Sequence, residues 1–128
     1  MVDSWGNVYG TTWGGTGYCI GCPLGAPIYK LHNTDSGWLF GIVARLPEDT
    51  STGLIHDANG VLYGTGIPAG GQGDVFELRP SPGPRFQLFG RLTENTLYQL
   101  NGDDGTSPND LTMDSQGNLY GTTTWGGR

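Results

Sequence analysis

The chain has almost no lysine and few charged residues of either sign. Lys30 is the single lysine, charged residues make up 14% of the 128 residues, and the six lysines and arginines are scattered. With a net charge of −6 at pH 7, the chain lacks the clustered basic residues that binding to nucleic acid requires. An acidic balance mainly keeps a glycine-rich protein in solution, and it also attracts cations.

Long apolar runs are missing too. A membrane-spanning helix needs about 20 consecutive apolar residues, and no stretch of this sequence approaches that length. Met1 leads directly into the first sequence motif, so we expect no signal peptide in this chain and no membrane partner. The localisation stays open. If the parent protein is exported, its targeting signal lies outside this chain.

Cysteine is scarce. Cys19 and Cys22 form one CxxC pair, a pattern typical of half a zinc site, of a redox motif or of a local disulfide. The sequence has no second CxxC and no βαβ pattern around this one, which argues against the zinc and redox interpretations. We therefore expect a disulfide between the two cysteines under oxidising conditions, within a glycine-rich loop.

Helical periodicity is absent as well. No stretch holds apolar residues at helical spacing over three turns, because glycine interrupts every candidate. The 24 glycines and 8 prolines recur at matching positions beside tyrosine, tryptophan and leucine. This pattern favours many short strands joined by tight turns, so the predicted fold class is all-β.

The chain instead carries one motif three times. It reads DSWGNVYGTTWGG from Asp3, DANGVLYGTGIPAGG from Asp57 and DSQGNLYGTTTWGG from Asp114, so the copies start 54 and then 57 residues apart (57 − 3 and 114 − 57). Such a period indicates a repeat protein. We expect a single domain over 1–128, with copies at 3–56 and 57–113 and a partial copy at 114–128.

Each full copy predicts four strands, A to D. An Asp-x-x-Gly turn joins A to B, and its aspartate holds the backbone two residues further on. The glycine inside strand B indicates a bulge or the close approach of a neighbouring backbone. The expected ranges are 1–3, 53–57 and 110–114 for A; 7–12, 61–65 and 118–123 for B; 27–32 and 74–79 for C; 40–46 and, after a turn around 93–95, 96–100 for D.

Four-stranded units at this spacing predict the blades of a β-propeller. The separated motifs DxxGNLYGTT, GxVFxL, xLYxL and GxxPxxLxxD resemble the bacterial tandem repeat of the Gloeobacter–Verrucomicrobia (GloVer) type over nearly the whole chain. The turn and strand B also resemble NHL-repeat and gluconolactonase-like propellers. Copy one departs from the repeat, since Ala26-Pro27-Ile28 replaces Gly-Thr-Val and residues 49–53 shorten the GxxPxxL run.

Two blades are fewer than a propeller needs. Propellers close with about four to eight blades, and an open array leaves unpaired strand edges that favour association. We therefore expect a homo-oligomer in which each chain supplies two blades. A trimer with six blades is favoured, and a dimer with four or a tetramer with eight stays open.

Candidate metal ligands lie in and beside strand A. His56 occupies the position where copy three has Met113, and a trimer would gather three imidazoles on one axis, an arrangement suited to zinc. A half-buried histidine bonded to the backbone is the simpler reading. Asp57 and Asp114 have a sufficient role in their turns, although the resemblance to gluconolactonase-like propellers implies cation binding. Asp103, Asp104 and Asp110 suit either calcium or a solvated loop.

The tryptophans beside Gly-Gly loops suggest a second kind of site. Flat aromatic faces favour the apolar faces of sugar rings, so Trp13 and Trp125 form a candidate glycan platform. Two hypotheses follow for the chain. The first is a non-catalytic homo-oligomeric module that binds a metal, small molecule or glycan, and the alternative is a metal-dependent hydrolase of esters, lactones or phosphoesters. In the hydrolase His56 would act as a ligand or base, and zinc or calcium would be the cofactor.

Overall fold

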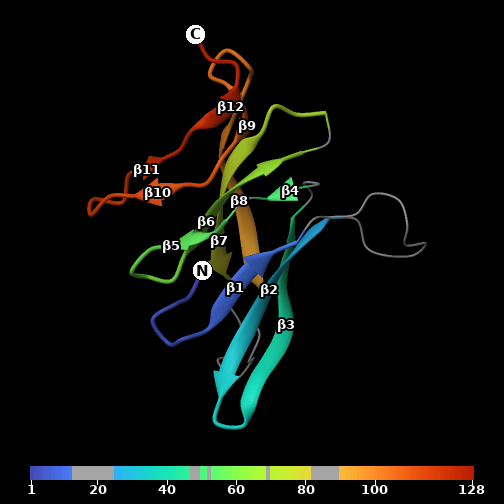
Figure 1. The fold of residues 1–128 in the computed structure, drawn as a ribbon, viewed down its shortest axis with the longest axis vertical. Helices are drawn as coiled ribbons and strands as arrows, with labels where there is room; N and C mark the ends of the chain where they lie inside the picture. The colour runs from blue at the N-terminus through green and yellow to red at the C-terminus, as the bar shows by residue number, and fades with distance from the viewer. Residues whose placement is uncertain (13–24, 47–49, 52, 69, 82–89) are drawn as a thin grey trace, which may run out of the picture.

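The computed structural model describes residues 1–12, 25–46, 50–51, 53–68, 70–81 and 90–128. These residues are all-β, and none of them forms a helix, so none supplies a helical membrane span. Their antiparallel sheets do not close on one another, and they follow the three sequence copies as three successive units (Figure 1). The predicted fold class is therefore confirmed as all-β.

The first unit is a three-stranded antiparallel sheet in the order β1-β2-β3. A two-residue turn joins β2 to β3, and Gly37 after it has a φ of 127° that favours glycine. The expected first strand A is reduced to a single bridge between Val2 and Val8. The strands are β1 (Val8–Thr11), β2 (Ala26–Thr34) and β3 (Gly37–Leu46).

The second unit is the complete one. Its sheet runs β4-β6-β7-β8, and β5 also pairs with β6. The predicted turn around 93–95 is wrong, because β8 runs straight through these residues and a register shift opposite Val75 and Phe76 takes up the extra residue instead. The strands are β4 (Thr50–Ser51), β5 (Ile55–His56), β6 (Leu62–Ile67), β7 (Asp74–Pro80) and β8 (Leu92–Gln99).

The third unit contains two short ribbons, one formed by β10 and β11 and one by β9 and β12. Their pairings repeat those of the second unit 57 residues later, since His56 pairs with Leu62 and Met113 pairs with Leu119. The predicted strand B, 118–123, is thus interrupted between β11 and β12. The predicted strand A, 110–114, contains β10 alone, and β9 lies in the segment before it that the sequence predicted as a loop. The elements are β9 (Thr106–Pro108), β10 (Thr112–Met113), β11 (Leu119–Tyr120) and β12 (Thr123–Trp125).

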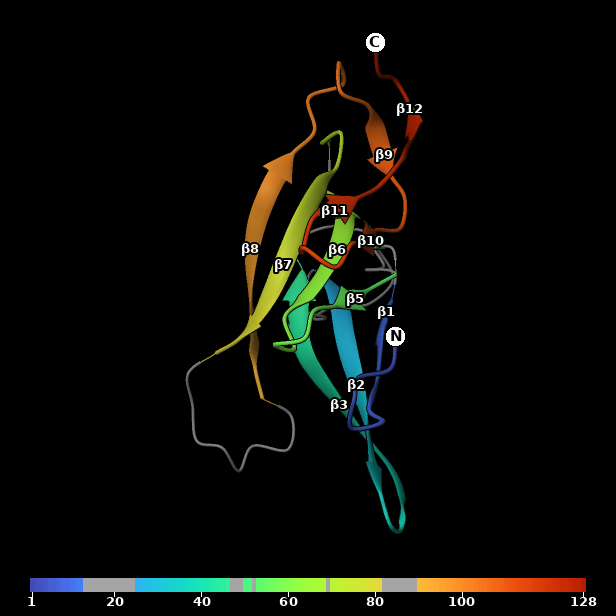
Figure 2. The same ribbon diagram turned by 90° about the vertical axis from the view of Figure 1, so that its left-hand side faces the viewer.

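The core lies between the first and second sheets. Each sheet presents one face to the other, as expected for strands whose side chains alternate between two faces. Apolar side chains from β2 and β3 meet others from β6, β7 and the segment before β5, and Figure 2 shows the two sheets side by side. The buried cluster consists of Ala26, Ile28, Val43, Leu46, Leu54, Leu62, Phe76 and Leu78.

The glycine inside strand B makes room for a side chain. A Cβ on Gly10 would collide with the Tyr29 ring, and one on Gly64 would lie 2.7 Å from Cζ of Phe76. Neither glycine has a positive φ, so space rather than backbone conformation requires it. The predicted close approach is real, but an aromatic ring on strand C makes it and not a neighbouring backbone.

Candidate functional site

The Asp-x-x-Gly turn is held by one carboxylate. Oδ1 of Asp114 accepts the backbone N–H groups of Gln116 and Asn118, each over 2.9 Å. Oδ2 accepts the Asn118 side-chain amide over 2.8 Å and the Tyr120 hydroxyl over 3.0 Å. Hydrogen bonds from Asn118 are the main reason that the pKa of Asp114 falls to about 2. The expected turn role of Asp114 is confirmed.

Asp3 is bound in the same way in the first unit. Its carboxylate accepts the backbone N–H groups of Trp5 and Asn7, and the Asn7 amide over 2.8 Å. Tyr9 supplies the fourth bond. Burial raises the pKa of Asp3, but the hydrogen bonds, led by those from Asn7, outweigh burial and leave the pKa lowered. Both carboxylates are thus fully engaged by their own turns.

Asp57 differs from these two because Val61 replaces the asparagine. Its Oδ1 accepts Asn59 N over 2.8 Å and Val61 N over 3.0 Å, and its Oδ2 accepts the Tyr63 hydroxyl over 3.2 Å. Valine has no amide to donate, so Oδ2 of Asp57 receives one hydrogen bond fewer than Oδ2 of Asp114. A carboxylate has about four acceptor positions, which leaves one of them available to a ligand.

His56 has a defined tautomer. Its Nδ1 lies 3.1 Å from the backbone oxygen of Asp57, and a carbonyl oxygen only accepts, so Nδ1 carries the proton in the neutral ring. Nε2 then presents its lone pair. The half-buried histidine bonded to the backbone, which the sequence suggested as the simpler reading, is what the structure shows, and it leaves Nε2 available as an acceptor or metal ligand.

A cavity of about 310 Å³ lies between the turns of the first and second units. His56 and Asp57 reach it from β5 and the turn that follows. Trp5 reaches it from the first turn, with 77% of its surface exposed, and a half-buried Tyr9 reaches it from β1. The lining residues are Asp3, Ser4, Trp5, Tyr9, His56, Asp57, Ala58, Gly60 and Leu62.

Three departures from the repeat converge on this cavity. Trp5 stands where the other turns have Asn59 and Gln116, so turn geometry does not require a tryptophan. His56 stands where the third copy has Met113. The third departure is Val61, which leaves Oδ2 of Asp57 with one acceptor position unfilled. The sequence reasoning missed Trp5, although comparison of the three turns would have singled it out.

Tyr9 adds a phenol to the same wall. Burial, followed by the charge of Asp3 and its hydrogen bond, raises the pKa of Tyr9 to about 12. The Lys30 ammonium lies 5.6 Å from the centre of the Tyr9 ring, within range of a cation–π contact. The phenol therefore stays neutral at physiological pH and presents a hydroxyl rather than an anion.

The other predicted oxygen ligands are engaged separately. Oδ1 of Asp110 accepts Gly53 N over 2.8 Å and links the second and third units. Oδ2 of Asp104 accepts the Tyr98 hydroxyl over 2.6 Å, while Asp103 pairs with Arg128 over 3.4 Å. Within the described part of the chain, no group of three or more His, Cys, Asp or Glu side chains comes together as a metal site.

The predicted glycan platform of Trp13 and Trp125 stays a prediction. Trp125 lies on β12 with 70% of its surface exposed, and it is absent from the lining of the cavity beside His56. Trp13, Cys19 and Cys22 lie outside the described residues. The exposed indole of this cavity is instead Trp5.

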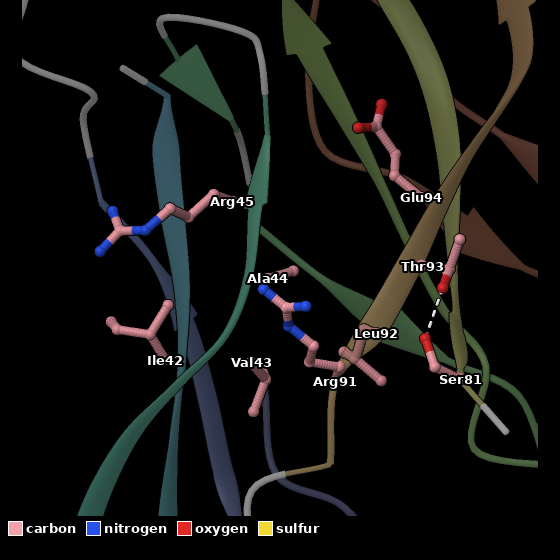
Figure 3. Close-up of a pocket in the computed structure, with 9 residues that line it drawn as sticks. All are labelled: Ile42, Val43, Ala44, Arg45, Ser81, Arg91, Leu92, Thr93 and Glu94. Atoms are coloured by element: carbon pink, nitrogen blue, oxygen red, sulfur yellow. Dashed lines mark hydrogen bonds between the residues drawn. The ribbon is translucent and has the colours of Figure 1, made fainter. Parts of the chain in front are cut away.

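A larger cavity, of about 580 Å³, lies between the edge strands β3 and β8 (Figure 3). The Arg91 side chain extends into it towards β3, whereas Arg45 and Ile42 lie on the other side of β3. Ser81 and Thr93 hydrogen-bond to each other on its β8 side. Its lining contains one carboxylate, that of Glu94, but no histidine.

Comparisons with known proteins identify no relative. The chain matches no family model, no curated protein and no solved structure. The resemblance to the GloVer repeat and to NHL-like propellers therefore rests on the sequence motifs alone.

Proposed function

We propose that the chain is a β-propeller-type carbohydrate-binding module, and that the cavity between its first two turns holds one sugar ring. The observation that carries the proposal is the convergence of Trp5, His56 and the under-bonded Asp57 on one cavity. Trp5, His56 and Val61 are departures from a repeat that forms the same turn without them, and Val61 leaves Asp57 one hydrogen bond short. Local structure therefore does not account for them.

The chemistry of the cavity suits a sugar. An exposed indole offers a flat face for the apolar face of a pyranose ring. Nε2 of His56 and Oδ2 of Asp57 accept hydrogen bonds, and they would receive them from neighbouring sugar hydroxyl groups. The volume of about 310 Å³ lies at the lower end of small-molecule sites, which suits one ring better than a long chain.

Binding is best measured with a panel of pyranoses, their linked disaccharides and an immobilised glycan array. We expect Trp5→Ala to weaken binding about fivefold, because aromatic stacking contributes on the order of 1 kcal/mol. His56→Ala and Asp57→Asn should weaken it as well. Trp38→Ala is the matched control, since Trp38 is also exposed but lies on β3 outside the cavity.

Two results would contradict the proposal. One is the absence of binding to any glycan in the panel by folded protein. The other is binding that survives Trp5→Ala but is lost in Trp125→Ala, which would return the site to the platform expected from the sequence.

A metal-dependent hydrolase is the second candidate. It is favoured by the free Nε2 of His56 and the free acceptor of Asp57, which line one cavity. A third ligand would have to come from another copy of the chain or from a substrate. Zinc or calcium that co-purifies with the protein, and ester or lactone hydrolysis that chelation abolishes and His56→Ala reduces, would support this function over simple binding.

We further propose that the three units are propeller blades, the third of them partial, and that identical copies complete the ring. The six-bladed trimer expected from the sequence counts two blades per chain and stays a prediction. Supporting this, the second unit is an antiparallel four-stranded meander with a split inner strand, the first unit packs face to face against it, and the third repeats its pairings.

A further inference from the structure

The same contact between units occurs twice within the chain. Leu54, Leu62 and Phe76 of the second unit pack against the first unit. Fifty-seven residues after Leu54 and Leu62, Leu111 and Leu119 of the third unit line a cavity shared with Thr65 and Val75 of the second. We call the side of a unit that meets the following unit its front face, and the side that meets the preceding unit its back face.

Oxygen contacts also join the second and third units. The Thr65 hydroxyl donates to the Asn109 backbone oxygen over 3.1 Å, and Asp110 accepts Gly53 N over 2.8 Å. Thr65 is completely buried as a result. The front face of a unit is therefore a surface that the fold covers wherever the next unit is present.

The back face of the first unit lacks this cover among the described residues. Val8, Tyr29 and Leu31 take the positions that Leu62, Phe76 and Leu78 hold in the second unit, as the matching registers show. Phe76 and Leu78 are completely buried, whereas Tyr29 and Leu31 are only half-buried. The same surface is thus core in one unit and open in the other.

Side chains from β3 extend this apolar surface. Phe40 pairs with Leu31 and Ile42 pairs with Tyr29, and paired residues share a face of the sheet. The rings of Tyr29 and Phe40 stack with centres 5.6 Å apart. Phe40 is 61% exposed and Ile42 37%, and Arg45 lies on the same side of β3 as Ile42 (Figure 3).

The matching front face is open at the other end of the chain. Tyr120 takes the position of Tyr63 and is 55% exposed. Residues 101–128 carry four aspartates and one arginine, which complements Arg45 at the margin of the open back face. The third unit and the tip of the β2–β3 hairpin lie at opposite ends of the molecule's long axis (Figures 1 and 2).

We propose that a second copy of this chain docks the front face of its third unit, around Tyr120, on the back face of the first unit, around Tyr29, Leu31, Phe40 and Ile42. The interface is head-to-tail, so copies form a closed ring where the rotation between them permits it. This inference rests on the proposed assignment of the units as blades, and it does not depend on carbohydrate binding.

Light scattering on wild-type protein over a dilution series tests the contact. We expect a discrete multiple of 13.6 kDa for the wild type and a shift to the monomer for Phe40→Asp. Leu97→Asp is the matched control, because Leu97 is 43% exposed on the edge strand β8 outside the proposed surface. A far-ultraviolet circular dichroism spectrum like that of the wild type confirms that each variant is folded.

Mixing two variants tests the head-to-tail geometry. Tyr120→Lys places a charge on the front face and keeps a partner for Asp114. Phe40→Asp retains an intact front face and Tyr120→Lys an intact back face, so each alone should be monomeric and an equal mixture should form a dimer. A self-complementary interface would give no such rescue.

Three outcomes would overturn the inference: a monomeric wild type, a Phe40→Asp variant of unchanged mass, or dissociation by Leu97→Asp as well. A monomeric wild type would mean that something other than a second copy covers the face. Sugar binding by monomeric Phe40→Asp separates this inference from the proposed function, because the cavity beside Trp5 lies within one chain.

Discussion

The hydroxyl of Tyr120 donates a hydrogen bond of 3.0 Å to Oδ2 of Asp114. Tyr63 and Asp57 repeat this bond over 3.2 Å in the second unit. The six-residue spacing between the aspartate and the tyrosine in each copy is therefore a structural unit, in which one carboxylate fixes both the turn and the first residues of the next strand.

The turn carboxylates should make the fold sensitive to acid. The pKa of Asp114 is about 2 against an ordinary 3.8, and those of Asp3 and Asp104 are also lowered. A lowered pKa contributes stability above the unfolded value, and that stability is lost as the pH falls through 3.8 towards 2. We expect the free energy of unfolding in urea to decline over this range and Asp114→Asn to decline less than the wild type.

Asp35→Asn is the control for this experiment, because Asp35 is exposed in the turn between β2 and β3. It should follow the wild-type pH dependence. Equal acid sensitivity of Asp114→Asn and wild type would show that the turn bonds contribute nothing to stability.

Filling the free acceptor of Asp57 should close the proposed sugar site. Val61→Asn restores the amide that binds the carboxylate in the other two turns, as Asn118 does over 2.8 Å. The new hydrogen bond to a charged group contributes about 1.5–3 kcal/mol, which offsets the loss of a buried valine worth about as much. Stability should therefore change little while glycan binding weakens.

Val61→Ala is the matched variant, since it loses apolar contact without adding a donor. It should bind the glycan as the wild type does, although with lower stability. If Val61→Asn binds as tightly as the wild type, Asp57 is not a ligand-binding residue.

Gly64→Ala tests the packing of an aromatic ring over strand B. A new Cβ would lie 2.7 Å from Cζ of Phe76 and 3.0 Å from Cδ2 of Leu54, and both residues belong to the buried cluster. Overpacking of this kind costs about 1–3 kcal/mol, so we expect a lower midpoint in thermal unfolding. Gly90→Ala, at a glycine with open space around it, should leave the midpoint unchanged.

Much of the fold could be predicted because each strand has a local signal. The repeat placed strands B, C and D of the first two units nearly where β1 to β3 and β6 to β8 lie. The division of the inner strand into β4 and β5 was not predicted. Gly53 lies between them and donates its N–H to Asp110, 57 residues away, a contact that the local sequence does not specify. The sequence predicted a turn around 93–95 because β8 contains one residue more than its partner strand requires. A register shift accommodates that residue, and a register shift has no distinct sequence pattern.

The candidate site was predicted only in part. His56 stood out as a departure from Met113, and Asp57 as a turn residue, because both differences are visible in the aligned copies. Trp5 is a weaker signal in the sequence, because Trp13 and Trp125 stand beside Gly-Gly loops and Trp5 does not. Which copies face one another across a cavity depends on how the sheets pack, and that information is not local.

Tyr9 should report directly on the occupancy of the cavity. Burial is the largest cause of its pKa of about 12, ahead of the Asp3 charge, so ionisation of Tyr9 favours unfolding as the pH rises from 10 towards 12. The pKa values of Tyr63 and Tyr98 are raised as well, so the component of Tyr9 is the part of the late phenolate absorbance that Tyr9→Phe removes. Asp3→Asn should move this component to lower pH but leave it above the ordinary 10.0, because burial persists.

A bound sugar buries the phenol further and should raise the pH at which Tyr9 ionises. Trp5→Ala should abolish that effect of sugar without shifting the ionisation of Tyr9 in the free protein. A late component that sugar leaves unmoved would place the binding site elsewhere on the molecule.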